Sequence, residues 1–447
     1  MKKETLLTSG PIYKTLVKFS LPIILSLFLQ SLYGAVDLLV VGRFATTADV
    51  SGVSTGSQLM MTLTYTVASM AMGITVLVGQ KIGAGKAEDA GRAIGAGIVL
   101  FFIISVFMTF ATEIAAPLLA DVLNTPQEAL SQTLRYIRIC SAGWIFIIAY
   151  NIFGCIFRGI GDSETPLKTV TIAAVLNIFA DILFVKGFGM GASGAALATV
   201  ISQAISVLVS VILLKKRHDV PVVFRPSFVR FDRPLIKKEL TLGIPIAIQD
   251  FLVGISFMVI LGVVNRLGLV ASAGIGVAEK VCAFIMLIPS AFSQSMTAFV
   301  AQNVGADNPE RSKTALKYGI LTSLAFGLVM FYLTFFHGDV MACVFAKDRA
   351  VIEAAHSYLK AYAIDCTLTS FMFCMVGYFN GWGKTTFVMI QGIVGAFCIR
   401  LPLAIIFGSL ENTSLFLIGL STPCSTFVQI ILCSAMLIHM RRVGKNC

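Results

Sequence analysis

Apolar runs of about 20 residues recur about twelve times along this chain, and each is long enough to cross the ~30 Å hydrocarbon core of a bilayer as a helix. Of its 447 residues, 57% are hydrophobic and only 13% are charged, which excludes an ordinary soluble protein. The pattern predicts an all-α integral membrane protein with twelve transmembrane helices. We place these at 16–41, 51–78, 93–119, 136–157, 166–185, 192–214, 242–265, 271–301, 315–336, 357–380, 386–409 and 415–440.

The two halves of the chain repeat one another. Pro22 and Arg43 correspond to Pro245 and Arg266, and the segments GQKIGAG and FRGIG correspond to AQNVGAD and FNGWG, all at an offset of 222–223 residues. Each half holds six predicted helices, an even number, so both halves enter the membrane in the same direction. The repeat therefore predicts two six-helix bundles in a parallel 6+6 arrangement, as in transporters that work by alternating access. Their bounds are 1–214 and 240–447, with a basic linker at 215–239.

Basic residues are concentrated in the segments on one side of the predicted membrane, above all in the linker 215–239. Because Lys and Arg accumulate in cytoplasmic segments, we expect this linker and both termini to be cytoplasmic. The net charge of +11 then reflects topology and contact with lipid, and nucleic-acid binding is not expected. No GxxxxGK[ST] motif for nucleotide phosphates occurs, so the energy for transport has to come from an ion gradient.

Four polar residues lie inside predicted helices of the first half, with no basic residue nearby: Asp37, Asn177, Asp181 and Thr199. At ~1.5 Å per residue, the two aspartates and Thr199 all lie roughly 6–12 Å below the outer surface. Asn177 and Asp181 are four residues apart and share a helix face. Two carboxylates, an amide and a hydroxyl suit a hard cation such as Na⁺, and paired carboxylates equally suit a proton carrier. Helix capping or packing is the structural alternative.

The second half holds a different charged set inside its predicted helices, made of Glu279, Lys280, Asp365 and Arg400. Two acids and two bases can neutralise one another without a ligand, which favours a structural ion-pair network. In the alternative interpretation, Glu279 or Asp365 contacts a cationic substrate. Asp250 lies near the predicted inner face, and the sequence leaves its role open.

The chain shows no pattern typical of an enzyme or of a metal centre. Its ten cysteines form no CxxC pair and no Cys/His cluster, so we expect no metal other than Na⁺ at the coupling site, and no cofactor. No nucleophile and base are placed together at the predicted membrane surface, which argues against catalysis. The charged groups form no ring, which disfavours a channel.

Several motifs together resemble the multidrug and toxic compound extrusion (MATE) family, and its DinF-like branch in particular. They are Pro22, Asp37 and Gly42-Arg43-Phe44 in the first helix, followed by GQKIGAGK, FRGIGDSETP and GMGASGAALAT, and they extend over essentially the whole chain. The resemblance implies a cation site at Asp37, Asn177, Asp181 and Thr199. A second branch of the family uses a Glu on the seventh helix, where this chain has Val253, so that site is not implied here.

The sequence therefore predicts a secondary active multidrug efflux antiporter of the cell membrane. It would export organic, cationic or amphiphilic compounds while H⁺ or Na⁺ enters, as a monomer whose partners are membrane lipids and small organic substrates. A flippase for lipid-linked saccharides or other lipids, with a related architecture, is the alternative. Such flippases usually have more helices and a basic cavity, whereas Lys280 and Arg400 are the basic residues inside the predicted helices here.

Overall fold

A computed structural model describes residues 7–216 and 222–443 of the chain, and these residues form helices without any strand. Within these residues, eleven helices are long and apolar enough to cross a membrane. The pair α4 (Gln127–Ala142) and α5 (Trp144–Ile160), bent by 58°, forms a twelfth span when the two helices are counted together. The predicted all-α architecture with twelve spans is confirmed, and one of the twelve is broken.

The described residues divide into two compact units. The first consists of the described parts of Met1–Gly10, Val17–Ile244 and Ala301–Asp307, and the second of Pro11–Leu16, Pro245–Val300 and the described part of Asn308–Cys447. Three helices therefore pass from one unit to the other: α1 (Ile12–Phe44) after Leu16, α8 (Arg233–Asn265) after Ile244, and α10 (Leu287–Gly305) after Val300.

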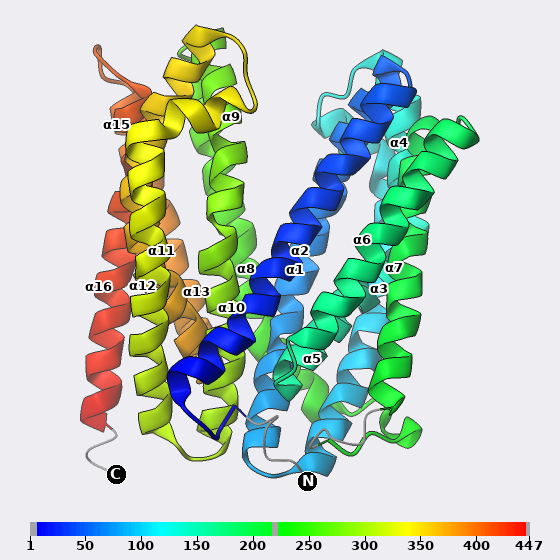
Figure 1. Ribbon diagram of the computed structural model, residues 1–447, viewed down its shortest axis with the longest axis vertical. Coiled ribbons are helices and arrows are strands. Elements are labelled where there is room, and N and C mark those ends of the chain that lie inside the picture. Colours follow the sequence, from blue (N-terminus) through cyan, green and yellow to red (C-terminus); the bar gives the residue numbers. More distant parts are fainter. Residues whose placement is uncertain (1–6, 217–221, 444–447) are drawn as a thin grey trace. The chain divides into compact units, whose positions relative to one another are not determined.

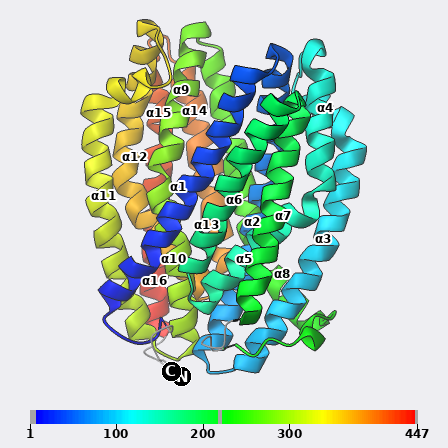
Figure 2. The ribbon, with the colours of Figure 1, turned by 45° about the vertical axis from the view of Figure 1, so that its right-hand side comes forward.

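The first unit holds, besides α4, α5 and most of α1, the helices α2 (Thr47–Gly83), α3 (Ala87–Val122), α6 (Glu164–Asp181), the π-helix η2 (Ile182–Gly187), α7 (Gly191–Lys216) and the short 3₁₀ helix η3 (Pro226–Phe228). The helices α6 and α7 run side by side (Figures 1 and 2). Helix α8 begins at Arg233, so the last seven residues of the predicted linker 215–239 are helical. Residues 217–221 of that linker and the two chain ends, for which a cytoplasmic location is predicted, lie outside the described residues.

The second unit contains most of α8 and, after it, α9 (Leu269–Ile285), α10 as far as Val300, α11 (Pro309–Cys343), α12 (Arg349–Gly381), α13 (Thr385–Ile393), the π-helix η4 (Val394–Arg400), α14 (Leu401–Gly408), α15 (Leu415–Gly419) and α16 (Ser421–Val443). The antiparallel pair α11 and α12 packs along most of its length (Figure 2). A buried apolar cluster that includes Ile260 and Ile275 forms the interior of this unit.

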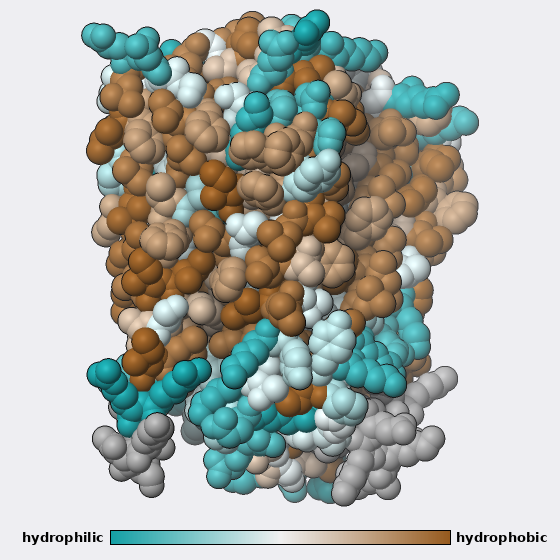
Figure 3. All heavy atoms as spheres, turned by 60° about the vertical axis from the view of Figure 1, so that its left-hand side comes forward, coloured by the Kyte–Doolittle hydropathy of each residue, from teal (hydrophilic) through white to brown (hydrophobic). Residues whose placement is uncertain are grey.

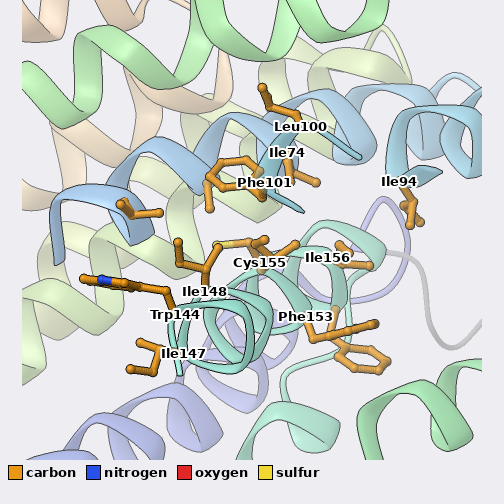
Figure 4. Close-up of a cluster of buried hydrophobic side chains, with 14 of the residues drawn as sticks. Ile74, Ile94, Leu100, Phe101, Trp144, Ile147, Ile148, Phe153, Cys155 and Ile156 are labelled. Atoms are coloured by element: carbon orange, nitrogen blue, oxygen red, sulfur yellow. The ribbon is translucent and has the colours of Figure 1, made fainter. Parts of the chain in front are cut away.

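The interior of the first unit is a continuous apolar cluster between α2, α3 and α5 (Figure 4). Ile74 from α2, Phe101 from α3 and Trp144 from α5 are all buried there. The single polar atom of the Trp144 side chain is satisfied, because its indole N–H donates to Thr112 Oγ1 at 3.0 Å. Val41 of α1 and Ala195 of α7 belong to the same cluster, so its close packing also holds two of the helices that carry the polar groups described below.

Other large apolar side chains point outward. On α3, Phe107, Phe110, Ile114 and Leu118 recur at intervals of three or four residues and are all exposed, so they form one apolar stripe. On the face drawn in Figure 3, hydrophobic residues cover the middle and hydrophilic residues gather at the two ends. An apolar exterior of this kind is suited to lipid, because aliphatic side chains exposed to water would be unfavourable.

Candidate functional site

Asp37, Asn177, Asp181 and Thr199 come together inside the first unit from α1, α6 and α7. The Thr199 hydroxyl donates a hydrogen bond to Asp37 Oδ2 at 3.3 Å, and the Asp37 carboxylate also adjoins the side chains of Asp181 and Asn177. Asp37 is 7% exposed, Asn177 1% and Asp181 0%. The structure therefore brings two carboxylates, an amide and a hydroxyl into one enclosed place.

The polar atoms of this cluster are largely without partners. Among the residues that the structure describes, none forms a hydrogen bond with Asp37 Oδ1, with either oxygen of Asp181, or with either polar atom of the Asn177 amide. Buried polar groups are normally paired, and two neighbouring buried carboxylates repel one another when both are charged. This set of oxygens therefore fits a bound H⁺ or Na⁺, each of which supplies the missing positive charge.

Local structure explains how α6 presents its two residues. Asn177 and Asp181 lie one turn apart at the end of the α-helix, and the backbone continues from Ile182 as the π-helix η2. A π-helical turn inserts an extra residue and leaves backbone groups less regularly paired, a feature that is frequent at functional sites. The sequence gives no direct signal for this turn.

The start of α7, which positions Thr199, is held by Asp49 of α2. The Ala192 N–H donates to Asp49 Oδ1 at 3.0 Å, while Asp49 also closes a capping box with Thr46. Gly191 adopts φ +55°, and a Cβ atom there would run into the Asp49 carboxylate. A glycine is therefore needed at this turn, eight residues before Thr199.

The structure adds residues that the sequence analysis did not single out. Tyr33 lies near Asp37 and interacts with the side chain of Gln203, and the buried Tyr136 lies near both aspartates. Tyr33 is four residues before Asp37 on α1, and Gln203 is four residues after Thr199 on α7. Residues four apart share a helix face, so the positions of Asp37 and Thr199 could have indicated Tyr33 and Gln203.

The second predicted set is divided by the structure. Asp365 and Arg400 are buried, but the side chains of Glu279 and Lys280 are exposed. No salt bridge within 4.0 Å involves any of the four with another described residue. Equal depth along the helices therefore does not place these four side chains in direct ion pairs.

Arg400 is stabilised by neutral partners instead. Its Nη1 donates to Ser256 Oγ at 3.1 Å, and its guanidinium carbon lies 4.4 Å from the centre of the Phe257 ring. Asp365 adjoins Thr426 and feels the charge of Arg400 at longer range. Asp250 is exposed on α8. The described residues contain no group of three or more His, Cys, Asp and Glu side chains that could hold a metal ion.

Comparison with known proteins matches both halves of the repeat. A family model described as MatE matches residues 22–183 and again residues 245–406. The chain is 27% identical over 355 residues to "Probable multidrug resistance protein YoeA" of Bacillus subtilis (strain 168), covering 78% of this chain and 76% of the relative. It is 26% identical over 415 residues to "Multidrug export protein MepA" of Staphylococcus aureus (strain MRSA252), covering 88% of each.

Solved structures share the fold. A protein described as "MATE in complex with MaL6" superposes with a TM-score of 0.93 at 21% identity, covering 100% of both chains. A transporter from Pyrococcus furiosus, described as having a binding pocket of reverse polarity that suggests a different function, reaches 0.92 at 21% identity and covers 99% of this chain and 98% of the other. At such identities the likeness establishes the architecture alone.

Proposed function

Since this chain belongs to the MatE family and is a multi-pass membrane transporter, we propose that it is a secondary active antiporter that exports organic compounds while H⁺ or Na⁺ enters. The relatives whose names specify multidrug resistance or export support the substrate class. The observation that carries the proposal is the enclosed cluster of Asp37, Asn177, Asp181 and Thr199, in which five buried polar atoms lack a hydrogen-bond partner within the described part of the chain. Coupling to an ion fits this cluster because a cation supplies the positive charge that neutralises its carboxylates.

In this proposal the cation is a transported substrate of the cluster. The two carboxylates attract it, and the Asn177 amide oxygen and the Thr199 hydroxyl complete an all-oxygen environment for Na⁺. If the ion is H⁺, one carboxyl carries it and donates a hydrogen bond to the other. In both cases binding removes the repulsion between Asp37 and Asp181, so it stabilises an arrangement in which α1, α6 and α7 pack closely.

Coupling requires that the ion bind two states of the transporter with different affinity. A shift from 1:99 to 99:1 needs a preference of roughly 10⁴-fold, or about 5.5 kcal/mol. Cation binding between two buried carboxylates is able to supply an energy of this order, because electrostatic interactions are strong where water is excluded. An organic cation that favours the other state is then exported when the small cation enters.

We also propose that the protein lies in the cell membrane as a monomer with its termini and the linker in the cytoplasm. Ser227, an exposed residue of η3 within the linker, provides the test of orientation. A cysteine introduced at Ser227 into a variant without reactive native cysteines should react with an impermeant thiol reagent only after the membrane is opened. Labelling in intact cells would reject the proposed orientation.

The proposed function is tested in proteoliposomes that contain the purified protein and a lipophilic organic cation such as ethidium. An inward H⁺ gradient without Na⁺, and an inward Na⁺ gradient at equal pH, are imposed separately. We expect one of the two to drive movement of the dye, and an ionophore that dissipates that gradient to abolish the movement. Movement of a lipid-linked saccharide without any gradient-driven movement of the dye would support a flippase and reject the antiporter.

A further inference from the structure

A third buried acid of the first unit lies outside the cation cluster, as we call Asp37, Asn177, Asp181 and Thr199. Glu239 is on α8, six residues after the helix begins, and it is 2% exposed. Neither of its carboxylate oxygens has a hydrogen-bond partner among the described residues. A charged carboxylate in such a place is strongly disfavoured, whereas a neutral carboxylic acid is far less costly to bury.

Close packing of three helices encloses this carboxyl group. A Cβ atom at Gly73 of α2 would lie 2.7 Å from the Glu239 carbonyl oxygen and 2.9 Å from the Gly243 nitrogen, so α2 and α8 touch through their backbones. Glu239 is one turn before Gly243 and therefore shares the face that meets α2. A Cβ at Gly97 of α3 would lie 3.4 Å from Glu239 Oε1 and against Ile74.

No counterion reaches Glu239 from these helices. The charged group that acts on it is Asp232, which precedes α8 and is itself negative. Arg92 of α3 is already paired, since its Nη2 lies 3.0 Å from Asp232 Oδ2. Lys237 and Lys238 are neighbours of Glu239 in sequence, but both are exposed on other faces of α8. On α2, the residues against Glu239 and Gly97 are Gly73 and Ile74, which carry no charge.

The ligand that fits one buried carboxyl is a proton. A metal cation requires several converging oxygen ligands, and the described residues contain no cluster of three metal-ligating side chains. We infer that Glu239 is a second proton-binding group of the first unit, protonated while the first turns of α8 pack against α2 and α3. It gives up this proton only when residues 233–244 separate from those helices.

The proton transfer is simple. When residues 233–244 open, water reaches Glu239, the O–H bond of the carboxyl breaks, the proton passes to water, and the carboxylate stays on the protein. Proton release from Glu239 affects a helix that belongs to both units, because α8 leaves the first unit after Ile244 and continues in the second. The proton on Glu239 is thereby linked to the packing of a segment that connects the two units. This inference stands apart from the role of Asp37 and Asp181.

Infrared spectroscopy of the purified protein tests whether Glu239 carries a proton. The Asp37→Asn/Asp181→Asn double variant removes the acids of the cation cluster and serves as the background. At neutral pH we expect this background to show a carbonyl band of a buried carboxylic acid that disappears when Glu239→Gln is added. Glu279→Gln, which changes an exposed acid, is the matched control and should leave the band in place. An unchanged band in the Glu239→Gln protein would overturn the inference.

A second measurement follows the opening itself by amide hydrogen exchange of residues 233–244, corrected for the intrinsic effect of pH. If opening releases one proton, the open population in the wild type should rise about tenfold per pH unit above neutrality. Glu239→Gln keeps the size of the side chain but has no proton to release, so its open population should not change with pH. Equal pH dependence in the two proteins would contradict the inference. Should Glu239→Gln fold poorly, Glu239→Asp should shift the infrared band, and an unshifted band would count against it.

Discussion

The two units are built on one repeated sequence pattern, yet their side chains at equivalent positions differ in charge and polarity. At the 223-residue offset that relates the two family matches, Asp37 of α1 corresponds to Ile260 of α8. Asp37 adjoins another buried carboxylate, whereas Ile260 is 1% exposed within the apolar cluster of the second unit. The repeat preserves the helix and its burial, but only the first unit uses this position for a charge.

The helices that carry the π-helical turns show the same contrast. At the same offset, Asn177 corresponds to Arg400 and Asp181 to Ala404. In the first unit, η2 follows two polar groups without partners, and in the second, η4 ends at an arginine bonded to Ser256 and stacked near Phe257. Both helices thus contain a π-helical turn, although at the 223-residue offset the two turns do not coincide. Among the described residues, both oxygens of Asp181 lack a hydrogen-bond partner, whereas Arg400 has one at Nη1 and none at Nε.

A third pair lies where the long helices change unit. Leu16 of α1 packs in the second unit, and its equivalent, Glu239 of α8, packs in the first. Both side chains are buried, and Leu16 lies near Gly319. An apolar residue is therefore sufficient to anchor such a segment. Packing alone does not require an acid in the equivalent place, and the carboxyl group of Glu239 adds a site that can bind a proton.

The largest effect should come from exchanging the residues of the first pair. Ile260→Asp buries an unpaired carboxylate in an apolar cluster, which costs on the order of 3–5 kcal/mol. We expect little folded protein in detergent by size-exclusion chromatography. The reciprocal change, Asp37→Ile, removes a buried carboxylate whose hydrogen bonding is incomplete, so it should fold at least as well as the wild type, without transport. Equal folding of Ile260→Asp and wild type would show that the two environments do not differ as described.

A smaller effect should separate Arg400 from Glu279. Arg400→Ala removes the hydrogen bond to Ser256 and the packing against Phe257, so we expect a loss of about 1–3 kcal/mol in thermal or denaturant unfolding. Glu279→Gln changes an exposed side chain without an ion pair and should stay within about 0.5 kcal/mol of the wild type. A large loss in both variants would instead support the ion-pair network between them.

The smallest effect concerns Thr199, which contributes one neutral oxygen to the cation cluster. Thr199→Ala should lower cation affinity by about threefold to tenfold, corresponding to roughly 0.5–1.5 kcal/mol. Its repeat equivalent Thr422 is buried in the second unit, so Thr422→Ala is a matched control and should leave the affinity unchanged. Equal losses in the two variants would show that the effect is on packing and not on the ion.

Hydropathy and repetition predict the helices because the bilayer restricts a spanning segment to a long, apolar helix. Depth and spacing likewise identify Asp37, Asn177 and Asp181. Residues at the same depth in the membrane, two of them on one helix face, can meet where their helices pack together. Depth does not give the rotation of a helix, however. For this reason depth alone predicts one charged set of Glu279, Lys280, Asp365 and Arg400, whereas in the structure the first two side chains are exposed.

Glu239 shows what local sequence does not reveal. It lies close to Arg233, Lys237 and Lys238, a context typical of a solvated linker, and it is the last residue of the predicted linker 215–239. Its burial depends on Gly73 and Gly97, which are far away in the chain and allow α2 and α3 to approach α8. Contacts of this kind are set by tertiary packing, so composition and periodicity over a short window do not contain them.

The central claim is that Asp37 and Asp181 bind the coupling cation, and direct binding to the purified protein tests it most closely. Saturable Na⁺ binding and proton release on titration would be measured for wild type, Asp37→Asn, Asp181→Asn and the exposed-acid control Asp250→Asn. We predict binding by wild type and Asp250→Asn, and its loss in the other two variants together with gradient-driven export, because the amides keep size but remove charge. Undiminished cation binding and export by Asp37→Asn would contradict the account.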